Sequence, residues 1–281
     1  MTTPSPLPHT PSSQRPATTA PALAAARAEL DAPWSLERTR RILLQRRWTW
    51  VRAELVIAEV EVNPDVARSW LPPPLALPAV AAATVFVADY PDTAMGFAYR
   101  EAGVLLHARL RGAPVLHCAW MVVDDDTAMI LGRELLGFPK KLARIEIAER
   151  DDHVEVEVAR RGVTLLRASF VAGAPTSPRP AFARPIVNVW GPPGAPSVLL
   201  CLDVPERAHE TRLAVASLRV RGSIADPLDA LAMDCERQEG AVTRTNVGLA
   251  PARVHTIPPG VRPVGLVSPA WLARQLPLRS L

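Results

Sequence analysis

The sequence predicts a mainly β fold, built largely of antiparallel strands with a few peripheral helices. Many segments alternate polar and apolar residues with the period of a strand, and few show the period or the capping residues of a helix. The chain has 281 residues and a hydrophobic content of 48%, which is enough to bury a substantial core. We therefore expect one large domain over residues 35–281.

The N-terminal segment, residues 1–34, is rich in Pro, Ala, Ser and Thr and lacks the charged-then-apolar layout of a signal peptide. It is expected to be a disordered leader. A short helix capped by Ser35 is predicted next, over residues 35–47. Residues 71–88 carry no charge, but the prolines in their first half favour a turn followed by a strand over a helix that crosses a membrane.

The first long strand is predicted over Trp48 to Val62. One face of this strand is expected to be buried and holds the even positions: Trp48, Trp50, Arg52, Glu54, Val56, Ala58, Val60 and Val62. Two opposite charges on an inward face need a reason. Either Arg52 and Glu54 pair with each other or with a neighbouring strand, or they border a polar pocket.

The rest of the chain adds strands and a few short helices. One or two helical turns are predicted at Asp65 to Leu71, ended by the prolines that follow. Short helices are also predicted to start at Asp226-Pro227 and Ser268-Pro269, because each pair places a capping residue before a first-turn proline. Further strands are predicted at Thr84–Tyr90, Val104–Leu110, Val115–Val123, Arg144–Glu149, His153–Arg160, Val163–Val171, Ser197–Val204 and Arg212–Arg221.

Composition and motifs exclude several classes of function. The net charge is +4, but arginine and acidic residues are interleaved along the chain, so nucleic-acid binding is not indicated. The three cysteines, Cys118, Cys201 and Cys235, are far apart and form no CxxC pair, which favours reduced thiols in a cytoplasmic protein and argues against a zinc site. Glycine-rich phosphate loops, HExxH and GxSxG are absent from the sequence. We predict no metal and no cofactor.

The most informative feature is a pair of lysines. Lys140 and Lys141 are the only lysines in the chain, and every other basic residue except histidine is arginine. A guanidinium stays protonated and cannot attack a carbonyl, whereas a neutral lysine amine can form an imine with a ketone or aldehyde. We interpret Lys140 as a Schiff-base lysine. The alternative is compositional bias, in which two lysines survived by chance in an arginine-rich protein.

The residues around the pair favour a fixed amine. Pro139 restrains the chain just before Lys140, and Gly132 and Gly137 allow close packing around it. The amine could be kept neutral by repulsion from the Lys141 ammonium or by burial in an apolar pocket. If the segment is extended, consecutive side chains point to opposite faces, and burial has to supply most of the effect.

The run GRELLGFPKKLA, residues 132–143, resembles the active-site signature of the acetoacetate decarboxylase superfamily. A second segment, YREAG at residues 99–103, resembles the family segment that bears an active-site glutamate. The resemblance implies that Lys140 forms the imine, that Lys141 is its neighbour and that Glu101 is the acid/base residue. It also implies an antiparallel β-cone, or double-layered β-sheet, with peripheral helices, assembled into a homo-oligomer.

The chain departs from the pattern of the true decarboxylases at two positions. Phe86 stands where they carry a second pocket glutamate, and Ala53 stands where they carry an arginine that is proposed to hold the substrate carboxylate. Arg52, one place away, remains a candidate for that task. Arg133 and Glu134 either orient the signature segment or touch substrate. Arg52, Phe86, Arg133 and Glu134 are thus the candidate substrate-binding residues.

Together these features predict a lyase that forms a lysine Schiff base with a small oxo-acid. Because Phe86 replaces a carboxylate, aldolase-dehydratase chemistry on a pyruvate-like 2-oxo acid is favoured. Decarboxylation of acetoacetate or another β-keto acid is the first alternative, and a non-catalytic β-cone that binds a small molecule is the second. His117, in an apolar strand, is interpreted as a core histidine.

Overall fold

The computed structural model describes residues 48–93, 96–190 and 198–256. Its strands are β1 (Trp48–Glu61), β2 (Ala82–Tyr90), β3 (Asp92–Thr93), β4 (Tyr99–Leu110), β5 (Ala113–Val123), β6 (Lys140–Leu142), β7 (Arg144–Arg150), β8 (His153–Arg160), β9 (Val163–Thr176), β10 (Ile186–Trp190), β11 (Val198–Asp203), β12 (Glu206–Val220) and β13 (Cys235–Thr256). Its helical elements are α3 (Pro64–Trp70), α4 (Asp126–Leu136) and the 3-10 helix η1 (Leu228–Leu231). All described residues belong to one unit, residues 42–281.

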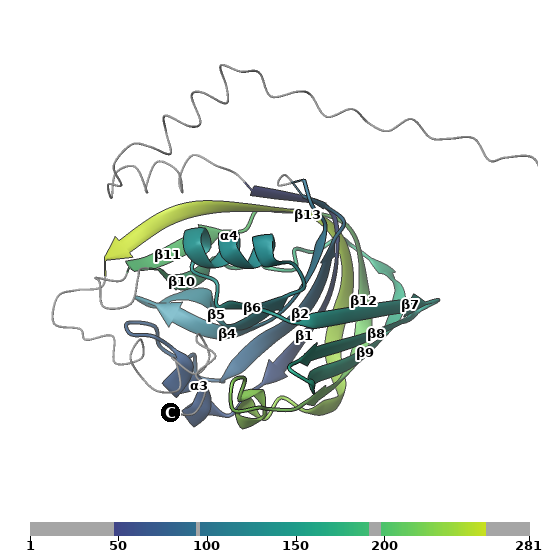
Figure 1. The fold of residues 1–281 in the computed structure, drawn as a ribbon, viewed down its shortest axis with the longest axis horizontal. Coiled ribbons are helices and arrows are strands. Elements are labelled where there is room, and N and C mark those ends of the chain that lie inside the picture. The colour runs from purple at the N-terminus through teal and green to yellow at the C-terminus, as the bar shows by residue number, and fades with distance from the viewer. Residues whose placement is uncertain (1–47, 94–95, 191–197, 257–281) are drawn as a thin grey trace, which may run out of the picture. The chain divides into compact units, whose positions relative to one another are not determined.

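The predicted mainly β class is confirmed. The described strands form one 13-stranded sheet in the order β3-β1-β2-β4-β5-β10-β11-β13-β12-β9-β8-β7, with β6 added beside β5. Neighbours are antiparallel except for the pairs β10–β5 and β5–β6, which are parallel. Because β1 also pairs with β13, the strands β1, β2, β4, β5, β10, β11 and β13 close into a ring (Figure 1).

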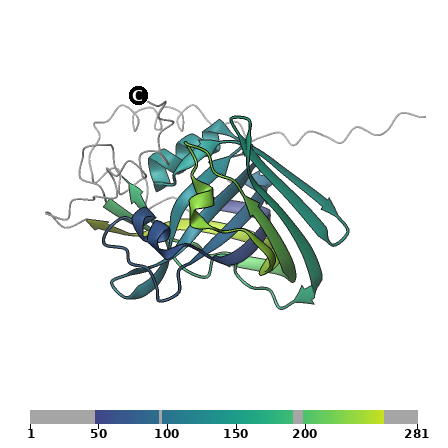
Figure 2. The same cartoon turned by 90° about the horizontal axis from the view of Figure 1, so that it is seen from below.

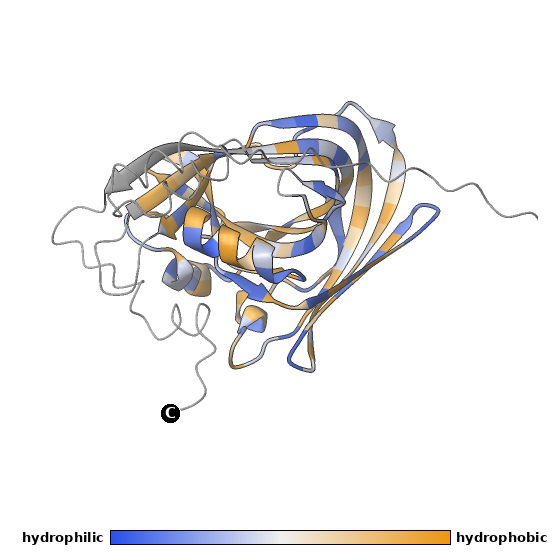
Figure 3. Ribbon diagram, turned by 45° about the horizontal axis from the view of Figure 1, so that its top comes forward, coloured by the Kyte–Doolittle hydropathy of each residue, from blue (hydrophilic) through white to orange (hydrophobic). Residues whose placement is uncertain are grey.

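The strands of this ring are rich in hydrophobic residues (Figure 3), and their apolar side chains pack on both faces of the ring wall. One face lines the ring interior, with Leu55, Phe86 and Leu105 among its buried residues. The other face packs against β7, β8, β9 and β12 in a second cluster, which we call the outer core. The helices α3 and η1 contact each other beside the outer core (Figure 2). The sheet therefore forms two layers, and the ring interior is separated from the outer core by the ring's own wall.

The inward orientation predicted for Arg52 and Glu54 is wrong, because the pairing of β1 with β13 shifts register between Trp50 and Ala53. Arg52 occupies this bulge with a left-handed φ of 57°. A bulge reverses which side chains face inward, so Trp50 and Ala53 are buried and Arg52 is exposed. Glu54 lies on the exposed side and pairs with Arg244 at 2.9 Å.

The predicted strands between Thr84 and Arg221 all lie on observed strands, and α3 forms where helical turns were expected. A 3-10 helix follows Asp226-Pro227, as predicted. The sequence analysis missed α4, β6, β10 and the long β13. The predicted leader, the helix over residues 35–47 and the helix start at Ser268 lie outside the described residues, and the proposed division at residue 34 stays a prediction. Among the described residues, no helix has the length and apolar character needed to cross a membrane.

Candidate active site

The lysine segment is held between a capped helix and a short parallel strand. The side chain of Asp125 caps α4 by accepting a hydrogen bond of 2.7 Å from the Ala128 amide. The helix ends at Gly137, whose φ of 67° is the left-handed conformation that glycine adopts most easily. Pro139 then leads into β6, which pairs with β5 so that Lys140 lies opposite Met121. The helix packs against β5, β6 and β10 (Figure 1).

Because β6 is extended, the two lysines project from opposite sides of the strand. Lys140 meets Glu101, whose neighbours Tyr99 and Leu105 belong to the ring interior. Lys141 meets Asp226, at the start of the segment that carries η1. Both lysines are 5% exposed, so neither ammonium is solvated like a surface lysine. Repulsion between the two ammonium groups is therefore weaker than their adjacency suggests, because each points to its own carboxylate.

Lys140 has one carboxylate and several aromatic rings around its amine. Its Nζ lies 2.5 Å from Oε2 of Glu101. That pair lacks the angles of a hydrogen bond, so Oε2 has no aligned donor, and we describe the contact as an ion pair. The amine is 5.2 Å from the centre of the Tyr99 ring and 5.7 Å from that of Phe138. The Trp50 indole fixes Tyr99 by donating a hydrogen bond of 2.8 Å to its hydroxyl.

The other titratable groups beside this pair are held in their neutral forms. Burial raises the pKa of Tyr99 well above its ordinary value, and the negative charge of Glu101 raises it further. Tyr90 is shifted in the same direction by burial and by Glu101. Burial and Glu101 also raise the pKa of the Cys118 thiol, against the opposing charge of Lys140. In these forms the groups can donate hydrogen bonds, whereas Glu101 is a carboxylate that can accept a proton and is therefore the candidate base beside Lys140.

Gly132 of α4 lies directly on the side chain of Lys140. A Cβ atom at this position would be 2.5 Å from Lys140 Cδ, 2.6 Å from Cε and 3.1 Å from Nζ. On the side of Gly132 the lysine borders a cavity of about 20 Å³, lined in part by Trp50, Tyr99 and Leu136. A water molecule fills such a volume, so α4 or these side chains must move when a larger molecule reaches the amine from this side.

Replacing Gly132 by alanine is expected to slow carbonyl capture at Lys140 by about 10 to 100-fold. The added methyl group would force the Lys140 methylenes or the helix aside, and a displacement of about 1 Å at a reacting atom can cost 100-fold in rate. The measurement is the rate of borohydride-trapped adduct formation, followed by intact mass. Ile130→Ala, on the exposed face of the same helix, is the control and should trap at the wild-type rate. Equal rates in the Gly132 variant and the wild type would show that close packing of Gly132 on Lys140 does not matter for adduct formation.

Phe86 forms part of the ring interior next to Glu101. It lies opposite Gly103 in the β2–β4 pair, two residues along β4 from Glu101. A Cβ on Gly103 would be 2.5 Å from the Phe86 ring, so this ring fits only because residue 103 has no side chain. Phe86 also packs edge to face on Phe182, with ring centres 5.1 Å apart. The position next to the glutamate is thus filled by aromatic carbon, and a second carboxylate is not present there.

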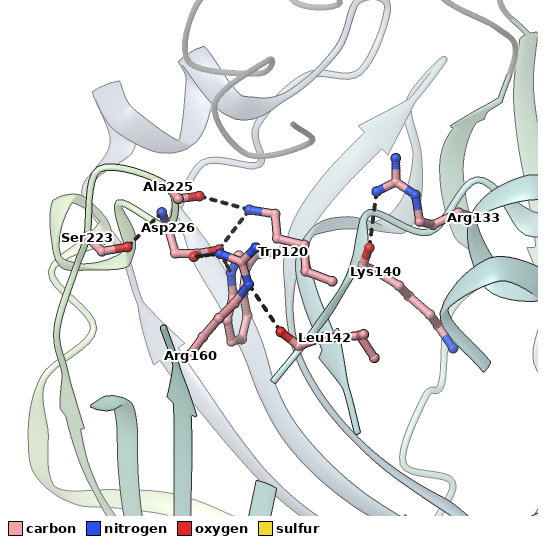
Figure 4. Close-up of polar contacts among 9 residues, drawn as sticks. Trp120, Arg133, Lys140, Leu142, Arg160, Ser223, Ala225 and Asp226 are labelled. Atoms are coloured by element: carbon pink, nitrogen blue, oxygen red, sulfur yellow. Dashed lines mark hydrogen bonds and ion pairs between the residues drawn. The ribbon is translucent and has the colours of Figure 1, made fainter. Parts of the chain in front are cut away.

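Lys141 belongs to a buried polar cluster that also contains Trp120, Arg160 and Asp226 (Figure 4). Asp226 is 1% exposed and accepts hydrogen bonds of 2.7 Å from Lys141, 2.7 Å from Arg160 and 2.9 Å from the Trp120 indole. Lys141 also donates to the carbonyl oxygen of Ala225 at 2.9 Å. The ammonium therefore ties β6 to the 223–227 loop, and it holds the strand from the side opposite to Lys140.

The remaining predicted site residues are placed differently. Arg133 is half-buried and donates a hydrogen bond of 3.1 Å to the carbonyl oxygen of Lys140, so it supports the lysine segment (Figure 4). The side chain of Glu134 is exposed, while its carbonyl accepts a hydrogen bond of 2.6 Å from Trp190. Arg52 pairs with Asp92 at 3.5 Å, its side chain is 75% exposed, and the structure does not bring it to Lys140.

A larger cleft of about 860 Å³ opens between the start of α4, the segment from Lys140 to Arg144 and the β8–β9 turn. Its cationic lining comes mainly from Arg133, Arg144, Arg160 and Arg161. It is distinct from the small cavity at the Lys140 methylenes, although Lys140 borders both.

Two polar residues of this region were missed as site residues. Asp226 was interpreted only as a helix cap, and nothing in the sequence separates it from Asp229, which is exposed. Asn188, on β10, is fully buried and donates a hydrogen bond of 3.0 Å from Nδ2 to the carbonyl oxygen of Leu136. Nothing in its short apolar segment distinguishes it in the sequence.

Comparison with protein families matches residues 32–250 to the family described as acetoacetate decarboxylase. The acetoacetate decarboxylase of Burkholderia cenocepacia (strain HI2424) is 31% identical over 107 residues, which are 38% of this chain and 43% of that protein. That of Ralstonia nicotianae (strain ATCC BAA-1114 / GMI1000) is 30% identical over 96 residues, 34% of this chain and 38% of that protein. The chain thus spans about two fifths of the length of these curated relatives.

Two solved structures share the fold. An acetoacetate decarboxylase from Legionella pneumophila subsp. pneumophila str. Philadelphia 1 superposes with a TM-score of 0.64 at 19% identity, covering 76% of this chain and 88% of that one. The enduracididine biosynthesis enzyme MppR, complexed with the condensation product of pyruvate and imidazole 4-carboxaldehyde, gives a TM-score of 0.64 at 21% identity, covering 75% and 90%. At these identities the likeness concerns the fold.

Proposed function

The chain belongs to the acetoacetate decarboxylase family, and from this premise we propose that it is a lyase that captures a small oxo-acid as an imine of Lys140. The observation that carries the proposal is the buried amine of Lys140, paired with Glu101 at 2.5 Å among aromatic side chains. Buried charged groups are costly unless they are paired, so a buried lysine–glutamate pair needs a reason, and catalysis supplies one here.

In the proposed reaction, the proton of the Lys140 ammonium moves to Glu101, and the neutral amine adds to the carbonyl carbon of the substrate. Glu101 returns this proton to the carbonyl oxygen and then transfers a second proton to it from the attacking nitrogen, so the oxygen leaves as water and an iminium remains on Lys140. The iminium then accepts the electron pair of the carbon–carbon bond that breaks. Water exclusion by Gly132, Tyr99 and Phe138 would protect the imine from hydrolysis until that step.

Within this class, we propose aldolase-dehydratase chemistry on a pyruvate-like 2-oxo acid. Phe86 supports this choice, because it fills with aromatic carbon the place next to Glu101 where the true decarboxylases carry a carboxylate. MppR, which has the same fold, is described with a condensation product of pyruvate and an aldehyde. That description concerns MppR, and it gives the proposal a precedent on this fold.

The proposal is tested by trapping. The protein is incubated with pyruvate, borohydride is added, and the modified peptide is identified by mass spectrometry. Because the chain has only two lysines, Lys140 and Lys141, the mapping is unambiguous. We expect one pyruvate-derived adduct, on Lys140. An adduct confined to Lys141 or to the N-terminal amine, or none with pyruvate, acetoacetate and longer 2-oxo acids, would overturn the proposal and favour a non-catalytic binding protein.

Decarboxylation is the second candidate, favoured by the 31% identity to an acetoacetate decarboxylase over 107 residues. It uses the same iminium, so trapping alone does not separate the two reactions. We expect CO₂ release from acetoacetate to stay near the uncatalysed rate while 2-oxo acids form the adduct. Rapid CO₂ release that disappears with Lys140→Arg would establish the decarboxylase instead.

A further inference from the structure

Two buried side-chain oxygens lack a hydrogen-bond donor among the described residues, Oε2 of Glu101 and Oδ1 of Asn188. Most buried polar atoms in proteins are paired, and leaving one unpaired costs about 1 to 3 kcal/mol. Glu101 Oε2 at least has the Lys140 ammonium beside it. Asn188 Oδ1 belongs to a neutral amide that is 0% exposed, so water at the surface does not reach it.

Asn188 lies on the ring wall beneath the end of α4, the helix whose Gly132 packs on Lys140. Its neighbour Ile186 pairs in parallel with Leu116, so Asn188, two residues further along β10, lies at the level of Cys118 on the same face. Cys118 is the thiol whose pKa responds to both Glu101 and Lys140. Across β11, Asn188 pairs with Leu200, another residue of the interior.

The orientation of the Asn188 amide follows from its other contact. Nδ2 must be the atom that faces the Leu136 carbonyl, because a carbonyl oxygen can only accept, so Oδ1 is the free end. Leu136 is in the last turn of α4, and its side chain lines the small cavity beside Lys140. Gly137 packs against the same asparagine, since a Cβ there would be 3.3 Å from Asn188 Cβ. One amide therefore joins the end of α4 to the ring wall, and its acceptor oxygen is left without a donor.

We infer that Asn188 is a substrate-binding residue and that its Oδ1 accepts a hydrogen bond from a hydroxyl group of the substrate. The inference rests on the proposed function and narrows its substrate class to oxo-acids that carry a hydroxyl away from the reacting carbonyl, as aldol products do. A site built to bind a hydroxyl discriminates against the analogue that lacks it, because the buried acceptor then stays unpaired. Asn188 binds and orients; as a neutral amide it moves no proton.

The test compares 4-hydroxy-2-oxopentanoate with 2-oxopentanoate, which differ by one hydroxyl. For each, the concentration that gives half-maximal borohydride-trapped adduct at Lys140 is measured, counting all substrate-derived adducts. The wild type should prefer the hydroxylated acid by about tenfold, the size expected for one hydrogen bond to a buried acceptor. Asn188→Leu should bring the ratio close to one while 2-oxopentanoate is still trapped.

A matched variant separates the binding of the substrate hydroxyl by Oδ1 from the hydrogen bond that Nδ2 donates to Leu136 of α4. Asn188→Asp keeps an acceptor but loses the donor to Leu136, so it should retain a preference for the hydroxylated acid. Equal ratios in the wild type and Asn188→Leu, or the same loss of preference in the Asp and Leu variants, would overturn the role of Oδ1. If no oxo-acid gives an adduct with the wild type, the proposed function fails together with this inference, whereas an adduct without hydroxyl preference overturns the inference alone.

Discussion

Lys140→Arg is expected to abolish the trapped adduct and to lower turnover of any oxo-acid substrate at least about 1,000-fold. Arginine keeps the positive charge beside Glu101, but its guanidinium cannot become a neutral amine, so the covalent route is lost. Loss of a covalent nucleophile typically removes most of an enzyme's rate enhancement. The measurements are intact mass after borohydride and steady-state kinetics. Circular dichroism and a urea unfolding curve show whether the variant protein still folds with the larger side chain packed against Gly132.

The adjacent substitution, Lys141→Arg, is the matched control. The side chain of Lys141 lies in the buried polar cluster with Asp226 and Arg160, where an arginine can still pair with the carboxylate of Asp226. We expect a loss of about 1 to 3 kcal/mol in unfolding free energy from overpacking, with the adduct on Lys140 retained. If both variants lose the adduct to the same extent while remaining folded, the two lysines act as a unit. The separate roles proposed here, imine formation for Lys140 and a structural ion pair for Lys141, would then be wrong.

The pair of lysines shows what the sequence could predict about the site. The two side chains were expected to diverge if the segment was extended, and β6 is extended. Their separate partners could not be predicted, because Glu101 and Asp226 are distant in sequence and are brought to opposite sides of β6 by different parts of the sheet. The roles of Lys140, Lys141 and Glu101 stay predictions, although the structure places Lys140 and Glu101 in contact.

Arg52 shows where the alternation of inward and outward residues along a strand fails to predict which side chains are buried. A period-2 pattern assigns faces correctly only while the strand is regular, and a bulge with one residue in the left-handed region moves every later side chain to the other face. Arginine is not a residue that signals such a conformation, so the bulge could not be predicted from the residue type. The buried positions from Val56 to Val62 were predicted to be buried, but they pack into the outer core and not the ring interior.

The missed elements have separate causes. The helix α4 is capped by Asp125 and Gly137, which are recognisable signals in the sequence, but no helix was predicted over the signature run. The strand β13 is polar along much of its length, and it is stable because it is paired on both edges, with β1 on one side and β11 and β12 on the other. Sequence pattern reports side-chain burial, and it cannot report backbone pairing that comes from distant strands.

Asp226→Asn is expected to lower the unfolding free energy by about 3 to 5 kcal/mol, because it leaves Lys141 and Arg160 buried without a counter-charge. For a chain of this size, the midpoint of thermal unfolding should fall by about 6 to 20 °C. Asp92→Asn is the matched control. It removes the carboxylate from an exposed pair with Arg52, so the expected change is at most about 1 kcal/mol. Similar losses in the two variants would show that the buried cluster adds no more than a surface pair.

The pH dependence of the Asp226 effect follows from its surroundings. Burial alone would raise the pKa of Asp226, but the charges and hydrogen bonds of Lys141, Trp120 and Arg160 hold it below the ordinary value of 3.8. A carboxyl whose pKa is lower in the folded state stabilises the fold above its unfolded pKa, and this contribution is lost as the pH falls through the folded value. The difference in unfolding free energy between wild type and Asp226→Asn should therefore stay constant from pH 7 to about pH 5 and shrink only below pH 3.8. Urea unfolding of both proteins at pH 7, 5 and 3.5 measures it, and a difference that already vanishes at pH 5 would mean that the carboxylate is not held by its cationic neighbours.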